Sequence, residues 1–257
     1  MLHLFPKCRG YMIMSCAITF MLSAALFSIG QKIPAVLLLL LGFFAARFFA
    51  EYNALKEHQK LLSLLYYKKV PAQFISIYEP LIQNPKLRDN VRFTMQSHLV
   101  NAHIIAGEFD TALEKLDHMP SFPVSSEAFG KSLITGNRCL IYCHLEDVEK
   151  AEELYQEFVT YGESITRKQQ RFSYIESKTI LTIRIKMLKN KCSKQDAYDL
   201  RERLKKQITP LQQAEFQYLL GRVYLVLKEN TFAKASFQEA ANAGDTLFVA
   251  RKAKEYL

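Results

Sequence analysis

Two apolar stretches within the first 50 residues constrain this chain more than any other feature. Residues 11–29 contain no charged side chain over 19 positions, and after a three-residue break residues 33–50 contain one basic residue, Arg47. A helix needs about 20 apolar residues to cross a bilayer, and a terminal arginine can extend its charge toward the headgroups. We therefore expect residues 1–50 to anchor the chain in a lipid bilayer through two transmembrane helices.

The short break makes the two expected spans antiparallel, so both chain ends lie on the same side of the membrane. Lys7 and Arg9 precede the hairpin and five basic residues follow it between Arg47 and Lys69, whereas the turn contains only Lys32. Cytoplasmic loops carry an excess of lysine and arginine. The charges therefore predict a multi-pass protein of a bacterial-type inner membrane, with its C-terminal domain in the cytoplasm.

A cleaved signal peptide is the alternative interpretation of the first stretch. Lys7 and Arg9 would be its basic region, and residues 23–25 lie near a potential cleavage site. The second stretch would still stop translocation and leave the C-terminal domain inside. A buried core hairpin is disfavoured, because both segments are apolar on all sides.

The chain becomes polar from Glu51 onward without a glycine- or proline-rich linker. The remaining residues carry 30 basic and 25 acidic side chains, and leucines keep a helical period as far as Tyr67. Residues 51–69 are therefore predicted to be a connecting helix that holds the following domain, residues 70–257, close to the bilayer.

Apolar residues at helical spacing predict that the domain is all-α and built from paired helices. Turn residues such as Pro71, Gly107 and Pro120 separate the apolar runs. The expected helices cover residues 71–84, 87–106, 109–119, 127–145, 148–161, 169–188 and 194–208, followed by a pair that begins at Leu211 and a last helix over residues 246–256.

The pair that begins at Leu211 resembles a tetratricopeptide repeat. Such a repeat has two antiparallel helices with a small residue where they cross, here Gly221 against Ala233. The segment from Gly107 to Leu116 is similar to the turn and second helix of the same repeat. The residues that carry the resemblance and are expected to pack the repeats are Ala112, Ala151, Gly221, Tyr224, Ala233, Phe237 and Ala240, together with Leu220.

The matching alanines indicate an irregular array. Ala112, Ala151, Ala197 and Ala233 are separated by 39, 46 and 36 residues, longer than the family period of about 34. The resemblance implies a tetratricopeptide-like α-solenoid of about four to five helix pairs, with the last helix as a cap. The pair over residues 169–208 is the weakest match, because Ile185 occupies the crossing position.

The resemblance also implies that the first helix of each pair lines a concave groove that binds a protein or peptide. Aligned on the alanines, the inward residues would be Asn101, Leu140, Lys186 and Arg222. The polar ones, Asn101, Lys186 and Arg222, could hold a carboxylate or a peptide backbone. The alternative is that each merely hydrates the groove.

Residues 167–206 form a strongly basic segment, with 13 basic and four acidic side chains. It could contact anionic lipid of the inner leaflet, bind an acidic peptide, or be a hydrated pair of helices. Nucleic acid is the weakest candidate, since no base-stacking motif accompanies the charge. The expected basic surface consists of Arg184, Lys189, Lys191, Lys194, Arg201 and Arg203.

No pattern typical of an active site, metal site or cofactor site is present. Cys139, Cys143 and His144 share one expected helix but lack the further ligands of a zinc site, and His98 and His103 likewise form only a pair. We therefore expect a membrane-anchored scaffold or adaptor and not an enzyme. A peptide-sensing regulator of a membrane partner is the alternative, and an enzyme without a recognisable motif is a third.

Overall fold

The computed structural model describes residues 5–120, 122, 126–206 and 208–257. Over these residues the chain is all-α, with twelve helices and no strand. It divides into two compact units, residues 1–63 with 83–87, and residues 64–82 with 88–257. Residues 1–4 of the expected anchor, and residues 121 and 123–125 in the expected turn after Pro120, lie outside the described residues.

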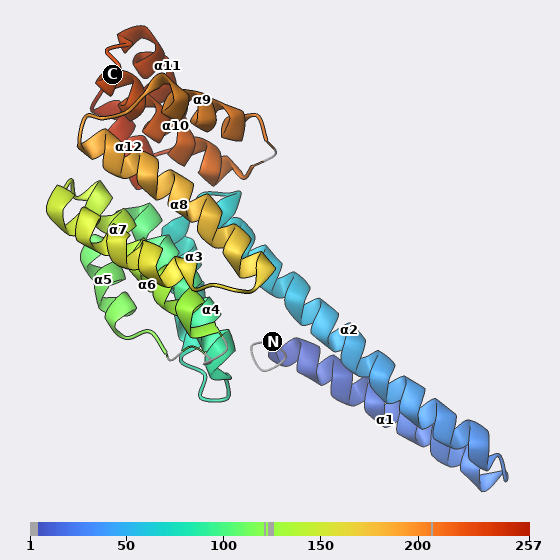
Figure 1. Ribbon diagram of the computed structural model, residues 1–257. Coiled ribbons are helices and arrows are strands. Elements are labelled where there is room, and N and C mark those ends of the chain that lie inside the picture. The colour runs from blue at the N-terminus through green and yellow to red at the C-terminus, as the bar shows by residue number, and fades with distance from the viewer. Residues whose placement is uncertain (1–4, 121, 123–125, 207) are drawn as a thin grey trace. The chain divides into compact units, whose positions relative to one another are not determined.

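The first unit is a hairpin of α1 (Pro6–Ser28) and the first part of α2 (Lys32–Tyr66), which run side by side (Figure 1). Gly30 takes a left-handed φ of 85° in the turn between them. The helices touch through small side chains, because Ser23 Oγ donates a hydrogen bond of 2.6 Å to the carbonyl of Ala35. A Cβ atom at Gly42 would lie only 2.2 Å from Thr19 Cγ2. Small residues thus permit the close approach.

Both helices of the hairpin are long and apolar enough to cross a membrane. Only 6% of the apolar window of α1 and 17% of that of α2 are buried, so large side chains such as Phe20, Leu41 and Phe48 are exposed. A core helix of a water-soluble domain would bury such side chains. Since α2 continues without a break to Tyr66, the expected connecting segment is helical up to that residue.

The second unit contains the end of α2 and ten further helices among the described residues. We call this unit the helical domain. Its helices after α2 are α3 (Pro71–Ile82), α4 (Asp89–Ala106), α5 (Phe109–Asp117), α6 (Glu127–His144), α7 (Val148–Glu163), α8 (Lys168–Leu188), α9 (Lys194–Leu204), α10 (Pro210–Val226), α11 (Asn230–Ala241) and α12 (Phe248–Lys254).

The same backbone turn follows every second helix of this domain. A residue with positive φ comes shortly after the ends of α2, α4, α6, α8 and α10, and such a left-handed residue ends a helix by turning the chain out of it. The spacing of the five positions is 38, 39, 44 and 38 residues. The repetition of helix, turn and helix that the sequence indicates is therefore present in the backbone, at Lys69, Gly107, Glu146, Asn190 and Lys228.

The helices that follow one another in the chain are not always packing partners. α6 packs closely on α7, and α10 on α11, as expected of antiparallel pairs. In contrast, α8 packs mainly against α6 and α7, and α9 against α10. The predicted pairing of residues 169–188 with 194–208 is thus not the main contact of either helix. The bulky Ile185 at the expected crossing is consistent with this difference.

Aromatic rings lie directly against glycines where helices cross. A Cβ atom at Gly162 of α7 would be 1.9 Å from the ring of Tyr174 on α8. At Gly221 of α10 it would be 2.7 Å from the ring of Phe237 on α11. The atoms nearest to Gly221 are therefore those of the Phe237 ring. All eight residues expected to pack the repeats, Leu220 included, are buried.

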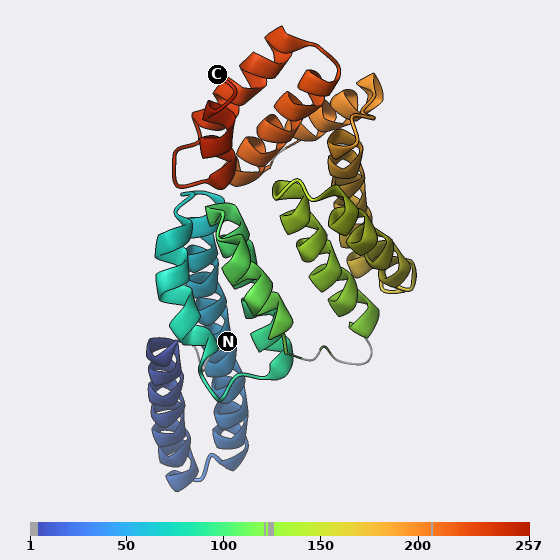
Figure 2. The same cartoon turned by 90° about the vertical axis from the view of Figure 1, so that its left-hand side faces the viewer.

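The last helix connects the end of the helical domain to its beginning. α12 packs against α11 and α10, and also against α4 (Figure 2). The ring of Phe248 contacts Phe109 with a centroid distance of 4.9 Å, and Arg251 Nη2 donates a hydrogen bond of 2.7 Å to the carbonyl of Ala106. A capping helix that only shields the final repeat was expected. The structure differs in that α12 also contacts α4, where the partly buried Phe248 packs against the cluster around Phe109.

Replacing Gly221 by alanine tests the contact between glycine and ring. Alanine is the better helix former by about 1 kcal/mol, but overpacking a core costs about 1–3 kcal/mol, and Phe237 is only 1% exposed. We expect Gly221→Ala to lower the free energy of unfolding by about 1–2 kcal/mol. In a Phe237→Leu background the same change should be neutral or stabilising. Thermal denaturation of the full chain in detergent, followed by circular dichroism, measures both. A higher melting temperature for Gly221→Ala alone would contradict the contact.

Candidate protein-binding groove

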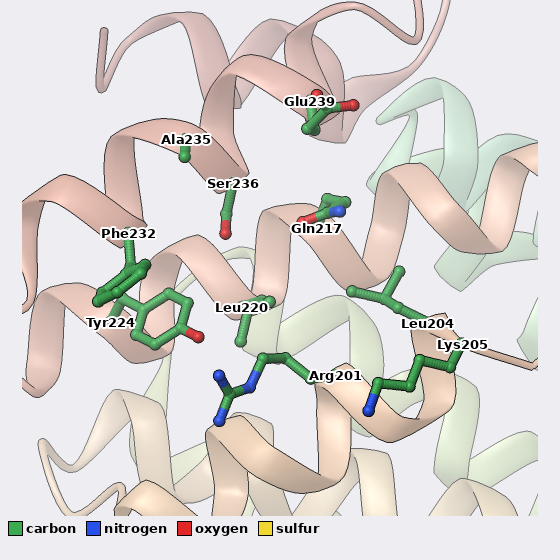
Figure 3. Close-up of a pocket in the computed structure, with 10 residues that line it drawn as sticks. All are labelled: Arg201, Leu204, Lys205, Gln217, Leu220, Tyr224, Phe232, Ala235, Ser236 and Glu239. Carbon is green, nitrogen blue, oxygen red and sulfur yellow. The ribbon is translucent and has the colours of Figure 1, made fainter.

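An open groove runs between α9 and α11, with α10 as its floor (Figure 3). Its volume is about 450 Å³, within the usual range for ligand-binding clefts. The residues that line it are Arg201 and Leu204 from α9, Lys205 directly after this helix, Gln217, Leu220 and Tyr224 from α10, and Phe232, Ala235, Ser236 and Glu239 from α11.

The floor and one end of this groove are apolar and aromatic. Figure 3 shows Leu220 between Gln217 and Tyr224, with the ring of Phe232 next to that of Tyr224. The two ring centroids are 5.4 Å apart. Tyr224 is buried, whereas 57% of Phe232 is exposed. An exposed aromatic ring beside a concave apolar floor is typical of a surface that binds a protein.

The walls of the groove carry opposite charges, with the positive charge on α9. Arg201 is exposed and its side chain extends toward Leu220 (Figure 3). Lys205 forms an ion pair of 2.5 Å with Glu202 of α9, and the hydrogen bond that Lys205 donates to Glu202 raises the pKa of Lys205. On the opposite wall, α11 contributes Ser236 and Glu239. Arg201 is therefore the cation best placed to meet an acidic group in the groove.

A capping box fixes the start of α9 and thereby the basic wall. Ser193 Oγ accepts a hydrogen bond from the backbone N–H of Asp196, and Asp196 accepts one of 2.7 Å from the backbone N–H of Ser193. Lys186 Nζ of α8 lies 2.8 Å from Asp196 Oδ1. Burial by itself would raise the pKa of the Asp196 carboxyl, but the hydrogen bonds from Lys186 and Ser193 lower it below its ordinary value.

The floor helix is fixed by similar local interactions and by an ion pair. Thr209 and Gln212 form a second capping box at the start of α10, and Pro210 occupies its first turn, where no backbone donor is needed. Arg222, further along α10, forms an ion pair of 2.8 Å with Glu146 in the turn after α6. The position of α10 therefore depends on the capping box at its start and on the ion pair with Glu146 in the turn after α6.

The polar residues predicted to bind a partner do not meet in one groove. Asn101 hydrogen-bonds to Tyr66, Lys186 pairs with Asp196, and Arg222 pairs with Glu146 while donating to Tyr218 Oη at 3.1 Å. Each already has a partner within the helical domain. The apolar Leu140, which shared the prediction, lines a different and smaller cleft between α6, α8 and α10.

The expected basic surface is partly neutralised and partly buried. Lys189 forms an ion pair of 2.5 Å with Glu152 of α7, and Arg203 pairs with Glu176 of α8. Arg184 is only 5% exposed, so its assignment to the surface was wrong. It lies on the side of α8 that packs against the domain interior. Lys191, Lys194 and Arg201 are exposed, and of these only Arg201 lines the groove.

Sequence reasoning missed the residues that α11 contributes to the groove. Phe232, Ser236 and Glu239 were not singled out, although Phe232 lies next to the buried Ala233 and must therefore point in another direction. A large aromatic residue outside the packing stripe of a predicted helix is the signal that could have identified it.

The cysteine and histidine residues considered in the sequence have packing roles. Cys139 and Cys143 are buried in the core of α6 and α7, and Cys139 Sγ donates to the carbonyl of Ala151 at 3.3 Å. His144 stacks on Phe109, and burial lowers its pKa well below the usual value, helped by the charges of Arg184 and Arg222. In the described part of the chain, no group of three or more potential ligands could hold a metal ion.

Comparisons with family models, with curated proteins and with solved structures found no match to this chain. The described residues of the chain form an all-α protein with two apolar N-terminal helices, and this description rests on the structure alone.

Asp196→Asn tests how the basic wall of the groove is fixed. A carboxyl whose pKa is lowered by folding stabilises the fold above its ordinary pKa, here 3.8, and loses that effect as the pH falls through the lowered value. We expect the substitution to cost about 1–3 kcal/mol at pH 7. The difference from wild type should shrink below about pH 4. Denaturation at several pH values checks this, with Asp199→Asn on the same helix as the control. A constant difference between pH 3 and 7 would contradict the role of the Asp196 charge.

Proposed function

We propose that this chain is a membrane-anchored adaptor whose helical domain binds an amphipathic helix of a partner protein in the groove between α9 and α11. The supporting observation is the combination of a concave apolar floor with an exposed Phe232 and an exposed Arg201 on the same groove. Recognition of a helix in an apolar groove is a common mode of peptide binding.

The charges of the groove define the chemistry of the proposed partner. Arg201, Lys205 and the exposed Lys206 place positive charge along α9, and Glu239 is the acidic side chain of the opposite wall. A helix with apolar residues on one side and acidic residues along one flank would match this pattern. Apolar residues at spacings of three and four would meet Leu220 and Phe232.

The membrane anchor gives the adaptor its proposed location. α1 and α2 have the length and composition of transmembrane helices, and the excess of basic residues around the hairpin favours a cytoplasmic helical domain. An anchored binding domain would concentrate its partner at the inner surface of a cell membrane. No catalytic group is required for this role.

Site-specific photo-crosslinking of the full chain in cells tests the proposal. A photoreactive residue at Ala235, which lines the groove and is exposed, should crosslink to one partner protein in the membrane fraction. The photoreactive residue placed instead at Glu114, which is exposed on α5, should not crosslink to this partner. Mass spectrometry of the crosslinked peptide should identify an amphipathic segment with acidic residues.

Two substitutions and their matched controls decide whether the groove is responsible. Phe232→Ala and Arg201→Glu should each reduce the crosslinking at Ala235 at least about tenfold, because they remove an aromatic contact and reverse a charge. Phe172→Ala and Lys194→Glu alter equally exposed residues outside the groove and should have little effect. Equal losses from both pairs of variants, or equal crosslinking from Ala235 and Glu114, would refute the proposed site.

A further inference from the structure

Arg184 is a buried cation without its full set of hydrogen bonds. It is only 5% exposed, and its Nε has no hydrogen-bond partner among the described residues. Burying an arginine is costly unless an anion and hydrogen bonds compensate for the lost hydration. The ion pairs of the neighbouring basic residues, such as Lys186 with Asp196 and Arg222 with Glu146, show that this domain normally provides such compensation. The Nε of Arg184 lacks a bond of this kind.

This arginine lines a cleft between α6, α8 and α10 that is separate from the groove of Figure 3. The volume of the cleft is about 170 Å³, many times the 10–15 Å³ that a single water molecule needs. Its other walls are largely apolar, with Leu133 and Leu140 from α6, Ile180 and Leu181 from α8, and Phe216 from α10. The cleft thus combines apolar walls with one buried positive charge.

The acidic residue of the cleft interacts with the charge of Arg184 but leaves the Nε of this arginine without a hydrogen bond. Glu215 of α10 lines the same space and is partly buried. Burial raises the pKa of its carboxyl, although the charge of Arg184 opposes this shift. The charge of Arg184 also acts on Cys139, Cys143 and His144 of α6. None of these is an anion comparable to a carboxylate.

We infer that the cleft between α6, α8 and α10 binds the carboxylate of a small apolar acid, with Arg184 as its cationic partner. The apolar walls would hold the body of the ligand, and the guanidinium would donate hydrogen bonds to its carboxylate oxygens. A phosphate is disfavoured, because a dianion would lie near Glu215 with only one cation to balance it. This inference concerns a second site and does not depend on the proposed adaptor function.

Matched ligands test the inference on the full chain in nanodiscs of zwitterionic lipid. Hexanoate offers both an apolar body and a carboxylate, hexanamide only the body, and acetate only the charge. Hydrogen bonds to charged groups indicate that hexanoate should bind about 10- to 100-fold more tightly than hexanamide. Acetate and inorganic phosphate should bind more weakly than hexanoate. Titration calorimetry measures these affinities. Equal affinity for hexanoate and hexanamide, or no binding of hexanoate, would overturn the inference.

Substitutions test whether the preference for hexanoate over hexanamide arises in the cleft. Arg184→Met should abolish the preference for hexanoate over hexanamide, while Arg201→Met, in the other groove, should keep it. Glu215→Gln should tighten hexanoate binding, since it removes the opposing acid. Retention of the full preference in Arg184→Met would contradict the assignment.

Two further experiments cover the case in which Arg184→Met does not fold and the question of where the ligand comes from. If Arg184→Met does not fold, Arg184→Lys retains the charge but loses the planar fork, and should show a smaller preference for hexanoate than wild type. An unchanged preference in that variant would count against the guanidinium. A peptide that ends in a leucine carboxylate reports a ligand carried by a partner protein. Tighter binding of that peptide than of hexanoate would overturn the assignment of a free small acid.

Discussion

The helical domain depends on the packing of aromatic rings against glycine backbones. Without a side chain at the glycine, two helices can approach until the ring lies on the backbone itself, and a single added methyl group would overlap the ring. Three of these contacts join successive helices, α6 with α7, α7 with α8, and α10 with α11, whereas the other two involve Gly107 in the turn after α4 and Phe122 between α5 and α6. The pairs are Gly107 with Phe248, Gly130 with Phe122, Gly136 with Phe158, Gly162 with Tyr174, and Gly221 with Phe237.

The sequence predicts the helices of this domain well and their partners less well. Periodicity and turn residues identify where most helices begin and end, because both signals are local; Gly107 ends α4 as predicted. Packing partners depend on contacts distant in the chain, and nothing local indicates that α9 lies on α10 or that Phe248 reaches Phe109.

The candidate sites depend on which face of a helix is inward. Lys186 and Arg184 are two residues apart and hence point in nearly opposite directions, so the sequence alone does not show which of them faces the domain interior.

The two candidate sites share α10. Gln217, Leu220 and Tyr224 of this helix form the floor of the groove, whereas Glu215 and Phe216 line the cleft that contains Arg184. The helix is fixed by the ring of Phe237, by the ion pair between Arg222 and Glu146, and by α12. Any change in the position of α10 would alter both sites. The apolar hairpin is a separate unit with its own contacts between small residues, and α2 is the helix that continues from it into the helical domain.

The central claim is that α12 joins the two ends of the helical domain into a closed array. Hydrogen–deuterium exchange of the full chain in nanodiscs tests it directly through Phe248→Ala. A closed array predicts faster exchange in α12 and also around Ala106 and Phe109, roughly 140 residues earlier in the chain, because the lost ring is their shared contact. Faster exchange confined to α10, α11 and α12, with unchanged protection near Phe109, would show an open array and contradict the account.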